Sequence, residues 1–254
     1  MTRKLFFIAT WTLLVGCSST VIVEQRELID PQSSWARVLK KFVNHDGLVN
    51  FTDLSRDRKD LEDYIYYLSQ ASPEKTPHEF PDEASKLAYY LNAHNAFSMY
   101  NVLNFDIPAD NGTFFKRFRF FYLTKFSMGG NEVSLYGLVN DFIRPVGDAR
   151  VHVALDCMAR SCPRLLNEPF DPKRLDAQLN AQAKQFYNDR RNIALVSEEK
   201  QVHVTEMLDF FTDDFLKTSP SLIAYINQYR PESEKIPEDY EVEFVDYDWT
   251  LHTQ

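Results

Sequence analysis

One short stretch of the chain holds the residues whose types and spacing are best suited to chemistry. Residues 150–165 read RVHVALDCMARSCPRL and contain His152, Cys157 and Cys162. The chain has only 3 cysteines, and the third, Cys17, belongs to a different chemistry described below. The two thiols of the folded part are therefore either bonded to each other, or at least one of them is there to react.

The cysteine pair allows three kinds of site. An oxidising compartment outside the cytoplasm favours a disulfide, and the spacing permits one, although closing so small a loop stabilises the fold only weakly. A reactive thiol would need a nearby cation to favour the thiolate, and Arg160, Arg164 and His152 are candidates. A metal site lacks support, because there is no C-x-x-C and no paired histidines. We predict no metal and no cofactor.

The apolar run before the cysteines predicts a strand over residues 150–156. In a strand His152 and Asp156 share one face with Ala154, about 13 Å apart, so each needs a partner from elsewhere in the chain. A half-buried histidine there is either a satisfied core residue or a general base.

Two asparagines stand inside an apolar helical pattern, AYYLNAHNAF. Asn92 and Asn95 are three residues apart, so they share a helix face close to His94. Asparagine is a poor helix former and, when buried, needs hydrogen-bond partners. The pair either pins adjacent loops, or orients a catalytic imidazole and donates to an oxyanion.

The elements that must position these residues form an α+β pattern, in which helices outnumber separated strands. We predict one compact, helix-rich domain over residues 33–254, with a small mixed or antiparallel sheet and a central strand near 150–156. Helices are expected over residues 33–44, 58–69, 82–103, 135–143, 173–189, 205–215 and 220–229. Hairpins are expected at 120–134, turning at Gly129 and Gly130, and at 193–204, with a last extended segment at 242–247.

The first sixteen residues are predicted to be a signal peptide. Arg3 and Lys4 precede a short apolar run that ends in Leu14-Val15-Gly16-Cys17, which resembles a lipoprotein cleavage site. The resemblance implies export and lipidation of Cys17, with residues 17–32 as a lipidated tether. Ser18 and Ser19 then favour sorting to the periplasmic face of the outer membrane. The membrane is thus the predicted partner through Cys17, while the body stays soluble.

Net charge and composition limit which classes of partner, besides the membrane, the protein is expected to bind. The formal net charge is −9, which disfavours nucleic acid as a partner. The run FFKRFRFFY at residues 114–122 mixes cations with aromatics, as membrane-surface and single-strand binders do. We expect instead a packed segment with solvated cations.

Four segments together resemble the family called domain of unknown function 547: AYYLNAHNAF, VSLYGLVNDFIRP, RVHVALDCMARSCPRL and the terminal VDYDWTL. The resemblance runs in order from about residue 35 to residue 251. Members occur as exported bacterial proteins and in plant proteins beside a coiled coil, without an established activity. The resemblance implies a set of family-pattern positions: Asn92, Asn95, His152, Cys157, Ser161, Cys162 and Pro163.

The leading hypothesis from the sequence is a membrane-anchored extracytoplasmic lipoprotein with a Cys/His-centred site. It would be a thiol-dependent hydrolase or acyltransferase on an envelope or peptide-like substrate. Cys162 would be the nucleophile, His152 the base, Asn95 or Asn92 the orienting or oxyanion-binding residue, and Cys157 a resolving thiol. The alternative is a non-catalytic binding or scaffold domain with a structural or redox-active Cys157–Cys162 disulfide.

Overall fold

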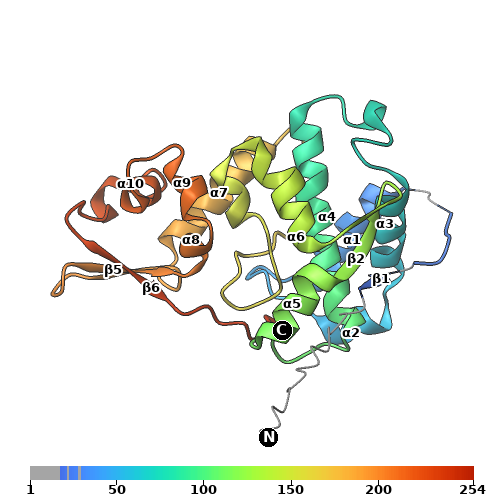
Figure 1. Cartoon of the computed structure of the whole chain (residues 1–254), viewed down its shortest axis with the longest axis horizontal. Helices are drawn as coiled ribbons and strands as arrows, with labels where there is room; N and C mark the ends of the chain where they lie inside the picture. Colours follow the sequence, from blue (N-terminus) through green and yellow to red (C-terminus); the bar gives the residue numbers. More distant parts are fainter. Residues whose placement is uncertain (1–17, 22, 28–29) are drawn as a thin grey trace, which may run out of the picture.

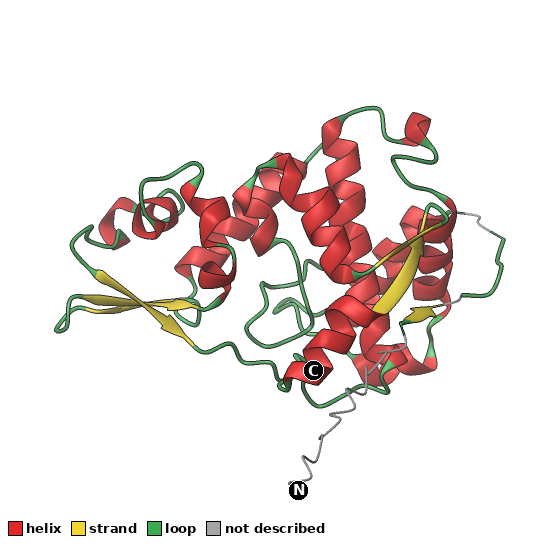
Figure 2. Ribbon diagram, viewed as in Figure 1, coloured by secondary structure: helices red, strands yellow, loops and turns green. Residues whose placement is uncertain are grey.

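The computed structural model describes residues 18–21, 23–27 and 30–254, so the predicted signal peptide and Cys17 lie outside the described residues. The fold is a helix-rich α+β arrangement, which confirms the fold class, and its strands form two small three-stranded sheets (Figure 2). Both sheets are mixed, with one parallel and one antiparallel pair each. None of the described helices is long and apolar enough to cross a membrane.

Four helices make up the first half of the body: α1 (Pro31–Phe42), α2 (Phe51–Arg56), α3 (Lys59–Gln70) and α4 (Glu83–Asn104), with the 3-10 turn η1 (Pro77–Glu79) before α4. The longest, α4, begins at a capping box in which Asp82 and Ser85 bond each other's backbone. Almost all of α4 is buried, so it forms the centre of the larger hydrophobic cluster. Asn92 and Asn95 therefore lie in the core.

The middle of the chain alternates short helices with the first sheet: α5 (Phe114–Phe118), the π-helix η2 (Arg119–Leu123), β2 (Thr124–Met128), β3 (Asn131–Val133), α6 (Leu135–Gly137), the π-helix η3 (Leu138–Ile143) and the 3-10 turn η4 (Arg144–Val146). The hairpin turns at Gly129 and Gly130, as predicted, because both glycines have positive φ angles, 58° and 89°. The third strand, β1 (Ser19–Val21), pairs with β2 in parallel. Part of the predicted tether thus lies on the body.

The last third forms a second lobe around its own hydrophobic cluster: α7 (Leu175–Asn188), β4 (Ile193–Val196), β5 (Gln201–Thr205), α8 (Met207–Phe210), α9 (Thr212–Leu216), α10 (Leu222–Asn227), the 3-10 turn η6 (Glu232–Glu234) and β6 (Glu241–Val245). Figure 1 shows this lobe at one end of the long axis and α1, α3 and α4 at the other. The helix at 173–189 and the hairpin at 193–204 match their predicted places.

The predicted central strand at 150–156 is wrong, because residues Ala149–Val153 form the 3-10 helix η5. The Asp148 side chain caps its start by accepting from the Arg150 N–H. Val151 joins the larger hydrophobic cluster while Ala149 and Val153 join the smaller one. The alternation of Val151, Val153 and Leu155 with other residues favours a strand, but so short an apolar run fits a buried turn as well, so the pattern could not decide between them.

The C-terminal segment leaves β6 and returns to the body (Figure 1), where it ends against the segment between α1 and α2. It pairs with three separate loops through the isolated bridges Asp110–Thr250, Ala159–Leu251 and Val49–Thr253. The second lobe and the cysteine loop are therefore fastened to the helical body by the last residues of the described chain.

Candidate functional site

A cavity of about 500 Å³ lies where the two lobes and the C-terminal segment meet. Its wall draws on α5 and η2, on α6 and η3, on η5, on α8, and on the C-terminal segment. Nine of its lining residues are aromatic: Phe114, Phe118, Phe121, Tyr122, Tyr136, Phe210, Phe211, Tyr247 and Trp249. A concave site of this size with few polar groups is the usual form of a small-molecule site.

His152 lines this cavity from η5, and its partner is Asp214 of α9. Nε2 of His152 lies 2.9 Å from Oδ2 of Asp214. The imidazole is stacked on the ring of Phe211, with the ring centroids 4.0 Å apart. The structure thus gives His152 a different partner from Asn95 or Asn92, the two orienting residues expected from the sequence.

The charges around Asp214 determine the proton positions of this pair. Burial opposes ionisation of Asp214, but hydrogen bonds from Arg144, Lys217 and His152 outweigh it and hold the pKa of that carboxyl well below its usual range. Burial lowers the pKa of His152 to about 4, although Asp214 favours its protonation. Near neutral pH the carboxylate is therefore charged and the imidazole is neutral, so Nε2 carries the hydrogen and donates it to Asp214.

This tautomer leaves the other ring nitrogen as a lone-pair acceptor. Nδ1 of His152 is buried and has no hydrogen-bond partner among the described residues. An unpaired buried acceptor is costly unless a ligand or water supplies a donor. This unpaired nitrogen belongs to a residue that lines the cavity.

Cys157 and Cys162 are joined in a disulfide. Cys157 lines the cavity, and its Sγ lies 3.5 Å from the hydroxyl oxygen of Tyr247. Cys162 lies outside the cavity lining, and its Sγ accepts hydrogen bonds from the backbone N–H groups of Cys157 and Ala159 at 3.2 Å each. In this oxidised form neither sulfur is a thiolate, so a nucleophilic Cys162 would require prior reduction.

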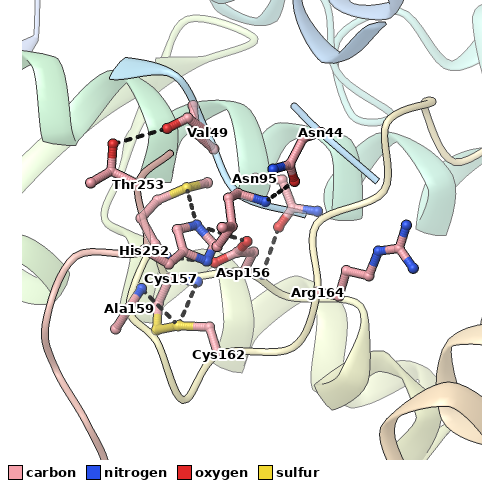
Figure 3. A network of polar contacts seen from close by, with 12 residues as sticks. Asn44, Val49, Asn95, Asp156, Cys157, Ala159, Cys162, Arg164, His252 and Thr253 are labelled. Carbon is pink, nitrogen blue, oxygen red and sulfur yellow. Dashed lines mark hydrogen bonds and ion pairs between the residues drawn. A yellow bond between two sulfur atoms is a disulfide. The ribbon is translucent and has the colours of Figure 1, made fainter. Parts of the chain in front are cut away.

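Asn95 holds the backbone that leads into the cysteine loop (Figure 3). Its Nδ2 donates to the Ala154 carbonyl at 3.0 Å, and its Oδ1 accepts from the Asp156 N–H at 2.9 Å. The same Oδ1 lies 3.3 Å from Nδ1 of His94, which itself lines the cavity. These contacts position a loop, which is one of the two roles expected for the asparagines; the catalytic role stays a prediction.

Asp156 continues this network with His252 of the C-terminal segment. Asp156 Oδ1 accepts from the Met158 N–H at 2.6 Å, and Oδ2 lies 3.3 Å from Nε2 of His252 (Figure 3). Burial raises the pKa of Asp156 well above its usual value, and burial lowers the pKa of His252 to about 4. Burial thus disfavours the charged form of both groups.

Asn92 lies elsewhere in the core, away from the cavity lining. Its Oδ1 accepts from Trp35 Nε1 at 3.2 Å and from the Phe170 N–H at 2.9 Å, and its Nδ2 donates to the Phe170 carbonyl at 2.9 Å. These three hydrogen bonds tie α1 and the loop around Phe170 to α4. Asn92 and Asn95 share a helix but serve different loops.

Sequence reasoning missed Asp214, Arg144 and the aromatic residues of the C-terminal half. Arg144 stands in the segment VSLYGLVNDFIRP, so the family pattern could have pointed to it. Asp214 follows another aspartate in an ordinary amphipathic segment, and only its burial distinguishes it. Among the described residues no group of three His, Cys, Asp or Glu side chains is arranged to hold a metal ion.

The fold and the cavity define a helix-rich α+β protein with an aromatic cavity beside a disulfide-bonded loop. Residues 78–187 match the family described as "Protein of unknown function, DUF547", so the chain carries a domain of that family. The match ends within α7, so Asp214 and the cavity residues of α8 and the C-terminal segment lie beyond it. No curated protein and no solved structure matches the chain.

Proposed function

We propose that the protein is a binding module of the cell envelope whose cavity holds a small, largely apolar molecule. In this proposal Cys17 is lipidated and anchors the exported protein at the periplasmic face of the outer membrane. The observation that carries the proposal is the aromatic cavity of about 500 Å³ in which a buried imidazole nitrogen lacks a partner. Aromatic walls supply contact area, and the imidazole acceptor supplies orientation.

The disulfide supports binding over thiol chemistry. It joins Cys157, in the cavity wall, to a loop that is fastened on both sides by hydrogen bonds. Arg160 N–H donates to the Thr250 carbonyl at 2.8 Å, and Asp248 N–H donates to Ser161 Oγ at 2.9 Å. A wall braced in this way is preorganised, which reduces the entropy lost when a ligand binds.

The binding proposal is tested by filling the cavity. Val139 of η3 lines the cavity, whereas Val146 is exposed and lies outside its lining. We expect the neutral probe N-phenyl-1-naphthylamine to gain fluorescence with the wild-type chain and with Val146→Trp, and to gain none with Val139→Trp. Equal binding by the two tryptophan variants, or no binding by the wild type, would contradict the proposal. Circular dichroism of each variant checks that it is folded.

The envelope location is tested separately on the cells that express the chain. Cys17→Ser removes the proposed acylation site, so we expect the protein to move from the membrane fraction to the soluble fraction. Mass spectrometry of the wild-type N-terminus should then show acyl chains on Cys17. A wild-type chain that is soluble and unmodified would refute the anchor while leaving the binding proposal intact.

A second candidate function is the thiol-dependent hydrolase or acyltransferase, because Cys157 and His152 line the same cavity. Reduction by a dithiol would release Cys157 as a nucleophile with His152 as its base. Under this candidate, iodoacetamide labels Cys157 of the reduced protein much faster in the wild type than in His152→Ala. Equal labelling rates in the two proteins would remove the candidate.

A further inference from the structure

The cavity differs in charge from the molecule that contains it. The chain has 37 acidic and 28 basic residues, yet the described residues that line the cavity include Arg117 and Arg144 and no aspartate or glutamate. Arg144 is already committed, because its Nε lies 2.6 Å from Asp214 Oδ2. Arg117 of α5 is half-buried and forms no ion pair with a described carboxylate, and its Nη1 donates to the Gly112 carbonyl at 2.7 Å. One cation without a carboxylate partner therefore lines an apolar site in an acidic protein.

The outer wall of the cavity is a ladder of stacked aromatic rings, defined here as Phe114, Phe118, Tyr122 and Tyr136. The first three recur every four residues along α5 and η2, so they share one face. Ring centroids are 5.9 Å apart for Phe114–Phe118, 5.3 Å for Phe118–Tyr122 and 4.4 Å for Tyr122–Tyr136, and each pair is stacked. The ladder presents a continuous apolar surface.

The ladder is open to solvent at the cavity mouth. Phe114 is 66% exposed, Tyr136 47%, Tyr122 41% and Phe118 38%. Single exposed aromatics need no explanation, but a contiguous row of them beside a cavity marks a site that a ligand covers. The expected packed segment at residues 114–122 is thus only partly realised: Phe120 is fully buried, while the ladder residues are not.

We propose that the cavity selects an anionic amphiphile, whose apolar body lies along the ladder and whose anionic group pairs with Arg117. The inference rests on the proposed binding function and names its ligand class. Arg117 stands on α5 with Phe114 and Phe118 of the ladder. Its guanidinium lies 4.9 Å from the ring of Trp249, another lining residue. A guanidinium at the edge of an aromatic wall matches a carboxylate, sulfonate or phosphate on an apolar body.

The test compares two fluorescent probes that differ by one anionic sulfonate group. 1-Anilinonaphthalene-8-sulfonate carries a sulfonate on the ring system of N-phenyl-1-naphthylamine, which has none. The full chain with Cys17→Ser is used so that no detergent, itself an amphiphile, is needed. We expect the sulfonate to bind about fivefold more tightly, as a half-exposed ion pair allows. Equal affinities would overturn the inference but leave the binding function standing, whereas failure of both probes would overturn both.

Matched variants test the guanidinium of Arg117 and the aromatic ladder separately. Arg117→Gln should remove the preference for the sulfonate, and Arg119→Gln should keep it, because Arg119 lies over the ring of Phe105 and outside the cavity lining. Phe118→Ala should weaken both probes about fivefold, as loss of aromatic stacking does. Phe115→Ala should not, since Phe115 is exposed on the same helix but outside the lining. Preference retained in Arg117→Gln would overturn the assignment.

A membrane surface is the competing source of the same chemistry. Sedimentation with phosphatidylglycerol vesicles, compared with phosphatidylcholine vesicles, separates it from a monomeric ligand. We expect no sedimentation of the Cys17→Ser chain with either vesicle at probe concentrations that saturate the cavity. Sedimentation that depends on Phe115 as strongly as on Phe118 would overturn the inference in favour of membrane contact.

Discussion

Two histidines of this protein are buried beside an aspartate, and the pKa values of the two aspartates are shifted in opposite directions. Asp214 lies beside His152 with Arg144 and Lys217 at 2.6 Å and 2.8 Å. Asp156 lies beside His252 with no described cation in contact. Both imidazoles have a pKa of about 4. The carboxylates differ because cations offset the desolvation of Asp214, whereas Asp156 has only the hydrogen bond from the Met158 N–H to offset its burial.

The comparison shows that burial alone does not identify a functional pair. The Asp156 network ends in backbone groups of the cysteine loop and so holds a wall in place. The Asp214 pair includes a ring nitrogen without a described partner, on a histidine that lines the cavity. The Asp156 network holds the cysteine loop, and the Asp214 pair contributes a residue of the cavity wall.

The largest loss of stability is expected from Asn95→Ala, which removes two hydrogen bonds from the Asp156 network. It leaves the Ala154 carbonyl and the Asp156 N–H buried without their partner. We expect the free energy of unfolding, measured with urea, to fall by about 3 kcal/mol. Asn180→Ala is the control, because that side chain bonds Asp176 on a partly exposed helix face. A loss below about 1 kcal/mol would mean that the network does not support the loop.

Asp214→Asn should cost somewhat less, about 2 kcal/mol, because it removes a charge on which two cations depend. Arg144 and Lys217 keep part of their hydration, which limits the loss. The amide can also no longer hold His152 in one tautomer. Urea unfolding gives the free energy, and the nitrogen chemical shifts of His152 report the tautomer. An unchanged tautomer would contradict the proposed role of Asp214.

The pH dependence of stability should separate the two pairs. Because the pKa of His152 is lowered from 6.5 to about 4, the unfolded chain binds its proton first, and stability falls as the pH falls from 6.5 towards 4. His94 and His252 act in the same direction. Asp156 acts in the opposite direction, because its raised pKa keeps a proton on the folded chain that the unfolded chain has lost.

We therefore expect the variants to differ in the slope of the unfolding free energy against pH, measured with urea between pH 4 and 6.5. His152→Gln should make the slope shallower by at most about 1.4 kcal/mol per pH unit. Asp156→Asn should make it steeper, because the opposing contribution is gone. Asn180→Ala, which removes no titratable group, provides the control variant and should leave the slope unchanged. A shallower slope in Asp156→Asn would show that this carboxyl is charged in the folded protein.

The smallest effect is expected from Asp156→Asn at pH 7. An amide replaces a carboxyl whose charged form burial disfavours, and its oxygen can still accept from the Met158 N–H. The free energy of unfolding should change by less than about 1 kcal/mol. A loss equal to that of Asp214→Asn would abolish the distinction between the two pairs.

Local patterns were enough for most of the elements. The helices at 58–69, 82–103 and 173–189 were placed within about two residues, because their apolar positions recur at the helical period. The glycine pair at 129–130 and the spacing of 193–204 placed both hairpin turns, although the predicted start of the first hairpin lies in the π-helix η2. The segment 149–153 failed because both of its sides are buried, one against each hydrophobic cluster. Its alternating valines fit a strand, and the local pattern does not show that two clusters share them.

The sequence by itself determined the fold class and the largely apolar helix α4. It also singled out the stretch that holds His152, Cys157 and Cys162 as the candidate site. Only the tertiary structure decided that the two cysteines are bonded, that Cys157 and not Cys162 lines the cavity, and that Asp214 is the partner of His152. Helical and hairpin signals lie within a few residues of each other in the chain. The partner of a buried charge comes from wherever the fold brings it, here 62 positions away.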